Sequence, residues 1–353
     1  LETINRRLAL SRIKSDSAQS FANEPTHPSN INLDNRLSAF GWGREDREWV
    51  QELAKSGTDP ISSLGYDGPL AALSKERQNL SDYFKEAVAV VTNPAIDRER
   101  EVEHFSTQTV IGARPPLIPG ELTQESTLAL DTPVLLDDPK YSPETKELLE
   151  CVFQETSAPT LQKITRHFPS EQITVLQAVT QRDETIAQAV ERIAQAAIEA
   201  VRNGTRLLIL DDADSFLGES GWVDPILVLG VVDRALRQSF IEKPPVTSPT
   251  PIPLGDNGKI DLGLVASNPQ MNLRRQVGLV LRSGAIRNLH DLIMCIGMGA
   301  DAIVPYLIFA TNLHDPNLQR EAQVERLKNT LKALRSGIEK CISTMGIHEA
   351  RGY

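Results

Sequence analysis

The sequence has few cysteines, no cluster of basic residues and no long apolar run, and each deficit excludes a class of protein. Its three cysteines, Cys151, Cys295 and Cys341, form no C-x-x-C pair, which argues against a disulfide framework and favours a reducing compartment such as the cytoplasm. Lys and Arg number 37 against 47 Asp and Glu, giving a formal net charge of −10. A nucleic-acid partner is therefore not expected, because phosphate binding needs clustered positive charge.

A membrane partner is not expected either. The longest apolar stretch toward the C-terminal end covers 295–311 and is interrupted by Asp301 and Pro305, whereas a spanning helix needs about 20 mostly apolar residues. Residues 1–7 have no apolar core of the kind found in a secretory signal. The chain starts at Leu1 rather than Met, which is typical of a fragment or a processed product.

The second half of the chain alternates apolar strands with amphipathic helices. We expect strands over 173–178, 207–210, 277–281 and 302–304, and helices over 184–202, 225–238, 286–296 and 319–341. Asp183 is the expected N-cap of the first of these helices, and Asn203-Gly204 its end. The strand at 207–210 is apolar on both faces, which suits a parallel sheet covered by helices. The pattern predicts an α/β fold of repeated β-α units with a parallel sheet, either open or partly closed as a degenerate barrel.

The first half is less regular. Residues 1–35 are polar and rich in Ser, Asn and Pro, so they are expected to form a linker or an extended segment. Short helices are predicted over 44–55 and 81–91, giving a mostly helical or irregular segment before the β-α units. Within 242–275, five prolines precede a Gly-Asp-Asn-Gly turn, which predicts an insertion. The main domain is placed at 36–315, followed by a long C-terminal helix within 316–353.

The ends of two predicted strands carry the candidate site residues. Ser283 and Gly284 follow one strand, with Arg282 beside them, and Asp211 follows another. In β-α folds the carboxyl ends of the strands are where sites form, and the positive charge of an arginine attracts an anion. Packing and turn formation are the competing explanation for these four residues.

Two further sequence patterns suggest a metal site and a phosphate site. Asp211, Asp212 and Asp214 offer the carboxylate oxygens that Mg²⁺ prefers, although a solvated acidic loop is the commoner role of such a cluster. The turn Gly297-Met298-Gly299 would let a phosphate approach the backbone, but it follows a helix and precedes a strand, the reverse of the order in a dinucleotide-binding fingerprint. We therefore expect a turn that ends a helix.

The sequence contains no recognisable catalytic or metal-binding constellation. None of its six histidines forms an i, i+4 pair, which is the spacing of a helical zinc site. No G-x-S-x-G elbow is present, so nucleophilic catalysis by a serine has no support. We predict no catalytic, cofactor-binding or metal-binding residue, and keep Arg282, Ser283, Gly284 and Asp211 as candidate anion-binding or interface positions.

Two separated regions carry a resemblance to a known family. The first begins at Ala39-Phe40-Gly41-Trp42, continues through Ser62-Ser63-Leu64-Gly65-Tyr66-Asp67 and Asp82-Tyr83-Phe84-Lys85, and ends at Val91-Thr92-Asn93-Pro94. The second comprises Ser283-Gly284-Ala285 and Gly299-Ala300-Asp301-Ala302 with Pro305-Tyr306-Leu307. In this order the segments resemble the central domain of glutamate synthase, and Arg351-Gly352-Tyr353 is similar to the start of the FMN domain of that family. Arg98 and Arg282 stand where the family has Pro and usually an acidic residue.

The resemblance implies a module of a larger enzyme that makes glutamate from glutamine and 2-oxoglutarate. In that family a glutaminase domain releases ammonia, which travels inside the protein to an FMN site beside an iron–sulfur cluster, with NAD(P)H or ferredoxin as reductant. The implied central domain carries no catalytic residue or cofactor itself. It positions the glutaminase and FMN-binding domains of the same polypeptide and lines part of the ammonia passage.

Two other functions remain open at this point. The chain could be an independent barrel-like enzyme with an anion site near Ser283 and Asp211, or a binding module separate from any synthase. Convergent polar side chains in a deep pocket at the strand ends would favour the independent enzyme, whereas a filled face would favour the linking domain.

Overall fold

The computed structural model describes residues 32–60, 73, 78–84, 105–114, 127–138, 143–241, 271–315 and 317–350. The sequence predictions for residues 1–31 and 85–91, and for 242–270 of the insertion, lie outside these residues. None of the helices in the described ranges is both long and apolar enough to cross a membrane.

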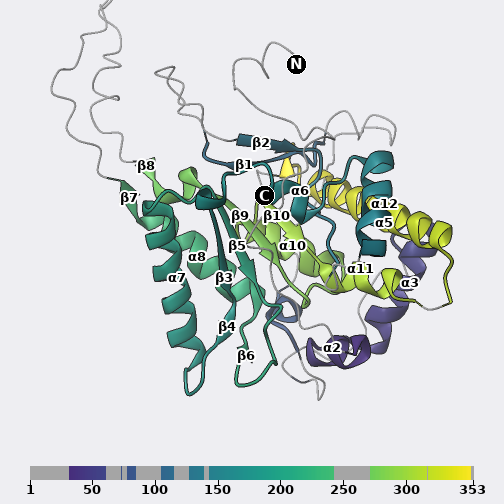
Figure 1. The fold of residues 1–353 in the computed structure, drawn as a ribbon, viewed down its shortest axis with the longest axis horizontal. Coiled ribbons are helices and arrows are strands. Elements are labelled where there is room, and N and C mark those ends of the chain that lie inside the picture. The colour runs from purple at the N-terminus through teal and green to yellow at the C-terminus, as the bar shows by residue number, and fades with distance from the viewer. Residues whose placement is uncertain are drawn as a thin grey trace, which may run out of the picture.

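A four-stranded parallel sheet forms the centre of the fold (Figure 1). Its strands are β3 (Ile173–Gln177), β5 (Leu207–Asp211), β9 (Gly278–Arg282) and β10 (Ala302–Val304), and each pairs with the next in chain order. Every residue of β5 and β9 is buried, as expected for strands covered on both faces. The predicted α/β fold with a parallel sheet is confirmed.

Helices connect the strands in turn. α7 (Ile186–Arg202) follows β3, α8 (Pro225–Gln238) follows β5, and α10 (Leu289–Gly297) follows β9. α8 contacts both α7 and α10. Because parallel crossovers are right-handed and the strand order is sequential, these helices lie on the same face of the sheet, as in a barrel.

Isolated bridges extend the sheet toward a closed ring. Beyond β10, Val134 bridges Ile303 in parallel, and Leu136 bridges Thr160 in parallel. The neighbours thus follow chain order from 134–136 through Thr160, β3, β5, β9 and β10, and back to Val134. Within the described residues no bridge joins Thr160 to β3, so the ring is open between these two segments. The predicted partial, barrel-like arrangement is therefore present.

The remaining elements surround this ring. The N-terminal segment supplies α2 (Leu33–Ala39), α3 (Arg44–Ser56) and the 3₁₀ helix η2 (Leu80–Tyr83). An antiparallel pair, β1 (Thr109–Gly112) and β2 (Thr127–Leu130), contacts β9 through β1. α5 (Pro143–Thr156), α11 (Tyr306–Leu313) and α12 (Arg320–Thr344) group with α3 on the right of Figure 1. The smaller elements are α6 (Leu161–Thr165), η3 (Ser170–Gln172), β4 (Val179–Thr180), β6 (Gly221–Trp222), β7 (Phe240–Ile241), β8 (Met271–Asn272) and η4 (Leu273–Gln276).

Several element boundaries differ from the prediction. α7 begins at Ile186 and is capped by Thr185, whose hydroxyl accepts the N–H of Gln188. Asp183, the predicted cap, has φ 58° and lies in the turn before the helix. The predicted α-helix over 81–91 is wrong at its start, because 80–83 form one 3₁₀ turn and Phe84 is extended. The last residues of the predicted insertion, 271–275, form β8 and most of η4.

Candidate functional site at the ends of the parallel sheet

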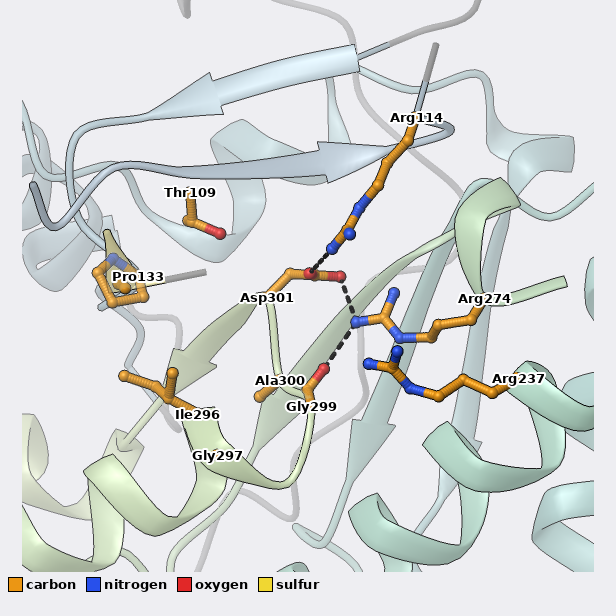
Figure 2. A pocket seen from close by; sticks show the side chains of 11 residues that line it. Thr109, Arg114, Pro133, Arg237, Arg274, Ile296, Gly297, Gly299, Ala300 and Asp301 are labelled. Carbon is orange, nitrogen blue, oxygen red and sulfur yellow. Dashed lines mark hydrogen bonds and ion pairs between the residues drawn. The ribbon is translucent and has the colours of Figure 1, made fainter. Parts of the chain in front are cut away.

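At the amino end of the sheet, the Gly297-Met298-Gly299 turn ends α10 (Figure 2). Gly299 has φ 108°, and the N–H groups of Met298, Gly299 and Ala300 all bond to carbonyls of α10. The N–H of Asp301 bonds to the carbonyl of Leu279. Because these backbone donors are used internally, the turn is the helix end expected from the sequence and offers no backbone cradle for phosphate.

At the carboxyl end, the structure brings Arg282 and Asp211 together. The pairing of β5 with β9 places the two residues directly opposite each other. Arg282 Nη1 lies 2.9 Å from Asp211 Oδ1, and Arg282 Nε lies 2.6 Å from Asp137 Oδ2. The guanidinium also lies over the ring of Tyr306, 4.7 Å from its centroid. Arg282 is 0% exposed, so it joins β5 to the segment beyond β10 in the interior.

Ser283 and Gly284 form a second set of contacts with Asp212. The Asp212 carboxylate accepts hydrogen bonds from the Ser283 hydroxyl, the Gly284 N–H at 3.0 Å and the Tyr306 hydroxyl at 3.1 Å. Burial raises the pKa of Asp212 to about 6; the Ser283 and Gly284 hydrogen bonds oppose this, while the charge of Asp211 adds to it. Burial also raises the pKa of Tyr306, as does the Asp212 charge.

Gly284 allows the close packing at this point. A Cβ atom there would lie 2.6 Å from the hydroxyl oxygen of Tyr306 and 2.9 Å from both Leu307 and Phe40. Such distances are shorter than van der Waals contact, so any side chain would displace its neighbours. The predicted site residue Gly284 therefore acts here through its lack of a side chain.

The N-terminal segment closes this end of the sheet. Arg36 of α2 donates to the carbonyls of Ala213 and Ser215 in the loop after β5, and its guanidinium lies 4.9 Å from the centroid of Phe40. Trp42 Nε1 donates to the carbonyl of Gly284 at 2.8 Å. Through Arg36 and Trp42, the N-terminal segment is thus hydrogen-bonded to the loops that follow β5 and β9.

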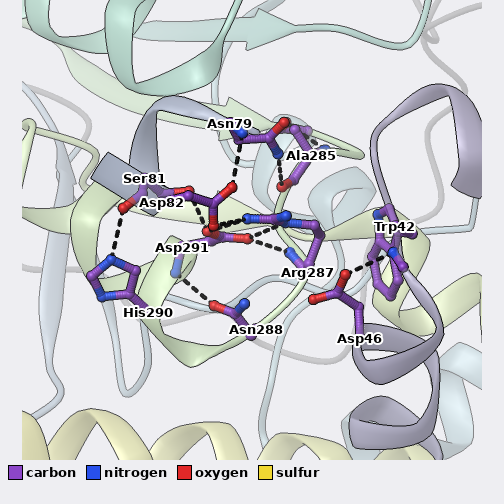
Figure 3. Close-up of polar contacts among 12 residues, drawn as sticks. Trp42, Asp46, Asn79, Ser81, Asp82, Ala285, Arg287, Asn288, His290 and Asp291 are labelled. Atoms are coloured by element: carbon purple, nitrogen blue, oxygen red, sulfur yellow. Dashed lines mark hydrogen bonds and ion pairs between the residues drawn. The ribbon is translucent and has the colours of Figure 1, made fainter. Parts of the chain in front are cut away.

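A neighbouring ionic network holds η2 in the same way (Figure 3). Arg287 contacts Asp291 at 3.0 Å and Asp82 at 2.7 Å. Burial alone would lower the pKa of Arg287, but the carboxylates of Asp291, Asp46 and Asp82 outweigh it and raise the pKa of this arginine. Ser81 donates to Asp291 at 2.5 Å, and the N–H of Leu80 donates to Asp224 at 2.8 Å. Arg287 therefore already has carboxylate partners.

The chemistry available to the network at the strand ends is limited by access. Asp212 and Ser283 resemble a base and a hydroxyl in hydrogen-bond contact, but they are 1% and 0% exposed. Asp211, considered as a Mg²⁺ ligand, faces Arg282. Across the described ranges, no group of three or more His, Cys, Asp or Glu is arranged to hold a metal ion. The arrangement links chain segments and leaves its reactive atoms out of reach of a substrate.

Three members of the network had not been singled out from sequence: Arg36, Asp137 and Tyr306. Arg36 stands in a polar segment with no distinguishing pattern, and it contacts residues about 180 positions away. Asp137 directly follows the buried run Val134–Leu136. Its place at the end of an apolar run is the one sequence signal that could have indicated it as a site residue. Tyr306 lies in Pro305-Tyr306-Leu307, one of the segments that carry the family resemblance.

Comparison with known proteins gives a consistent assignment. A family profile described as glutamate synthase central domain matches residues 35–244 and 253–353. The NADPH glutamate synthase large chain of Bacillus subtilis is 31% identical over 321 residues, covering 90% of this chain. The ferredoxin-dependent glutamate synthase of Spinacia oleracea is 29% identical over 330 residues, covering 89%. This chain spans 18% and 17% of the length of these two relatives.

Among solved structures, a flavocytochrome b2 variant with bound pyruvate aligns with 62% of this chain and 45% of its own, at 15% identity and a TM-score of 0.30. A second flavocytochrome b2 structure, with bound sulfite, aligns with 87% of this chain at a TM-score of 0.33. At these TM-scores the likeness supports no argument about this chain.

Proposed function

Since the chain belongs to the glutamate synthase central domain family, we propose that it is the non-catalytic linking domain of a glutamate synthase. In this role it holds a glutaminase domain and an FMN-binding domain of the same polypeptide in register and lines part of the passage for ammonia. FMN and an iron–sulfur cluster then belong to the complete enzyme, in the cytoplasm, and this chain binds neither.

One observation carries the proposal. The carboxyl ends of the strands, where barrel enzymes bind substrates, are filled by the chain's own Arg282, Asp137 and Asp211, all 1% exposed or less. Next to them, Asp212, Ser283 and Tyr306 are buried to the same degree. An independent enzyme would need accessible polar groups in a pocket at this place, so the alternative of an anion site at Ser283 and Asp211 is not favoured.

The buried contacts between distant chain segments also suit a domain that acts as a rigid spacer. Buried ion pairs that tie distant segments together leave few low-energy rearrangements, because breaking one leaves a charge unpaired in the interior. Arg282, Arg287 and Arg36 join segments that lie far apart in the chain. A domain that keeps two active sites in register benefits from this rigidity.

A domain exchange tests the proposal. The segment of the Bacillus subtilis large chain that matches this chain is either deleted or replaced by this chain, and glutamine consumption, ammonia release and glutamate formation are measured together. We expect the deletion to release free ammonia together with one glutamate per glutamine, because only the hydrolysis of glutamine proceeds. The replacement should restore, at least partly, the second glutamate, which is made from 2-oxoglutarate and the ammonia. A deletion variant that still forms two glutamates per glutamine, without free ammonia, would contradict the linking role.

A further inference from the structure

A second polar region lies at the opposite, amino end of the sheet and takes no part in the network at the carboxyl ends. It surrounds a cavity of about 160 Å³ between β1, the end of α8, η4 and the turn after α10. Arg114, Arg237 and Arg274 reach it from three separate segments (Figure 2). At about 30 Å³ for each water molecule, this is room for about five waters, or for a small ion with part of its hydration shell.

Arg274 is the structural centre of this region. Its guanidinium donates to Asp233 at 2.7 Å, Asp301 at 2.9 Å, and the carbonyls of Val277 and Gly299 at 2.9 and 2.7 Å. It is 4% exposed. Arg274 is thus an internal group, and the contacts above use four of its five N–H donors.

Arg114 and Arg237 differ from it. Within the described residues, Arg114 has one partner, Asp301 at 3.3 Å, and Arg237 has one partner, Asp233 at 2.5 Å. Each guanidinium carries five N–H donors in a fixed fork, and these two side chains are 39% and 58% exposed. Most of their donors therefore remain available at the cavity.

Among the residues that the structure describes, the charges around the cavity do not balance. Asp233 and Asp301 are each shared between Arg274 and one of the other two arginines. Three guanidinium groups thus face two carboxylates. Burial lowers the pKa of Arg114; Asp301 opposes this, while the charges of Arg274 and Arg275 lower it further. The structure holds Arg114 where an additional negative charge would stabilise it.

We propose that Arg114 and Arg237 bind a small oxyanion in this cavity, with the oxygens of its phosphate or carboxylate group accepting N–H donors that these two side chains leave unused. The fork geometry of arginine matches both kinds of oxyanion through paired N–H donors. With a net charge of −10, the chain as a whole repels anions, so binding depends on this local excess of positive charge. The site is independent of the linking role proposed above.

The test is calorimetric titration of the 353-residue chain with inorganic phosphate and, separately, with malonate. We expect saturable binding at one site for at least one of the two, and the ion that binds more tightly identifies the ligand class. Arg114→Gln and Arg237→Gln should each weaken that binding at least tenfold, and added NaCl should weaken it further.

Arg335→Gln is the matched control. Like Arg237, Arg335 lies on a helix, is about half exposed and contacts an acidic residue four positions away. It should leave binding unchanged. The proposal is overturned if neither ion binds, or if Arg335→Gln weakens binding as much as the two cavity variants. Circular dichroism checks the fold, and Arg237→Gln, at the more exposed position, carries the test if Arg114→Gln unfolds.

Discussion

Replacing Arg282 by Met removes the cation that lies between Asp137 and Asp211. Both carboxylates are 2% exposed at the side chain and the arginine is 0% exposed. Met keeps much of the volume, so the main effect is electrostatic: two carboxylates remain in the interior without their partner. Removing one partner of a buried ion pair typically costs about 3–5 kcal/mol. We expect a loss of that size in the free energy of unfolding at pH 7.

Urea unfolding followed by circular dichroism measures this loss. Arg335→Met is the control, because Arg335 is 48% exposed at the side chain and forms an i, i+4 pair with Glu339 on α12, for which about 0.5 kcal/mol is expected. In Arg282→Met, the unpaired carboxylates should hold their protons more tightly in the folded chain than in the unfolded one. The folded state then binds more protons, so the deficit should shrink as the pH falls from 7 toward 4.5.

A loss below about 1 kcal/mol, or a deficit that does not change with pH, would refute this reasoning. Either result would mean that water reaches the two carboxylates, and that the strand ends are open to solvent. The linking role would then lose the observation that carries it.

The remaining predictions use other described residues. Burial raises the pKa of Asp212 from 3.8 to about 6 in the folded chain, so folding favours its protonated form and stability should fall by roughly 2 kcal/mol as pH rises from about 4 to 7. In Asp212→Asn, unfolding at both pH values should show this part of the change missing, and an unaltered profile would count against it. Gly284→Ala should lower the free energy of unfolding by about 1–3 kcal/mol through the clash with Tyr306. Gly230→Ala in α8, where the added Cβ would lie 3.7 Å from Met298, should be neutral or stabilising. Equal effects would show that the packing at Gly284 is loose. Thr185→Ala should lower stability by about 1 kcal/mol, because it removes the oxygen that accepts the N–H of Gln188; an unchanged stability would count against Thr185 as the cap of α7.

The strands and the helices between them could be predicted because their signals are local. The apolar run at 207–210 and the amphipathic pattern at 225–238 each report burial of their own residues, and both occur in the structure as β5 and α8. α11 was missed because Tyr306–Leu313 is buried almost throughout, so it shows no amphipathic period. β1 and β2 are four residues each, which is too short for a clear alternation.

The position of the candidate site could be predicted from the sequence, but its burial and its neutralised charge could not. The order of strands places Asp211, Arg282, Ser283 and Gly284 at one edge, and the structure brings them together. That Arg282 is neutralised depends on Asp137, which lies 145 positions away, and that the edge is covered depends on Arg36 and Trp42 of the N-terminal segment. No local pattern reports such distant pairings. The cavity lined by Arg114, Arg237 and Arg274 could not be predicted from the sequence for the same reason.

The most direct test of the central claim is a binding and turnover measurement on the 353-residue chain with FMN, glutamine, 2-oxoglutarate and a reductant. If the chain's own side chains fill the strand ends, FMN should be removed completely by gel filtration and no glutamate should form, while a complete glutamate synthase in the same assay retains flavin and produces glutamate. Retention of stoichiometric FMN by this chain, or glutamate formation above the protein-free background, would contradict the account.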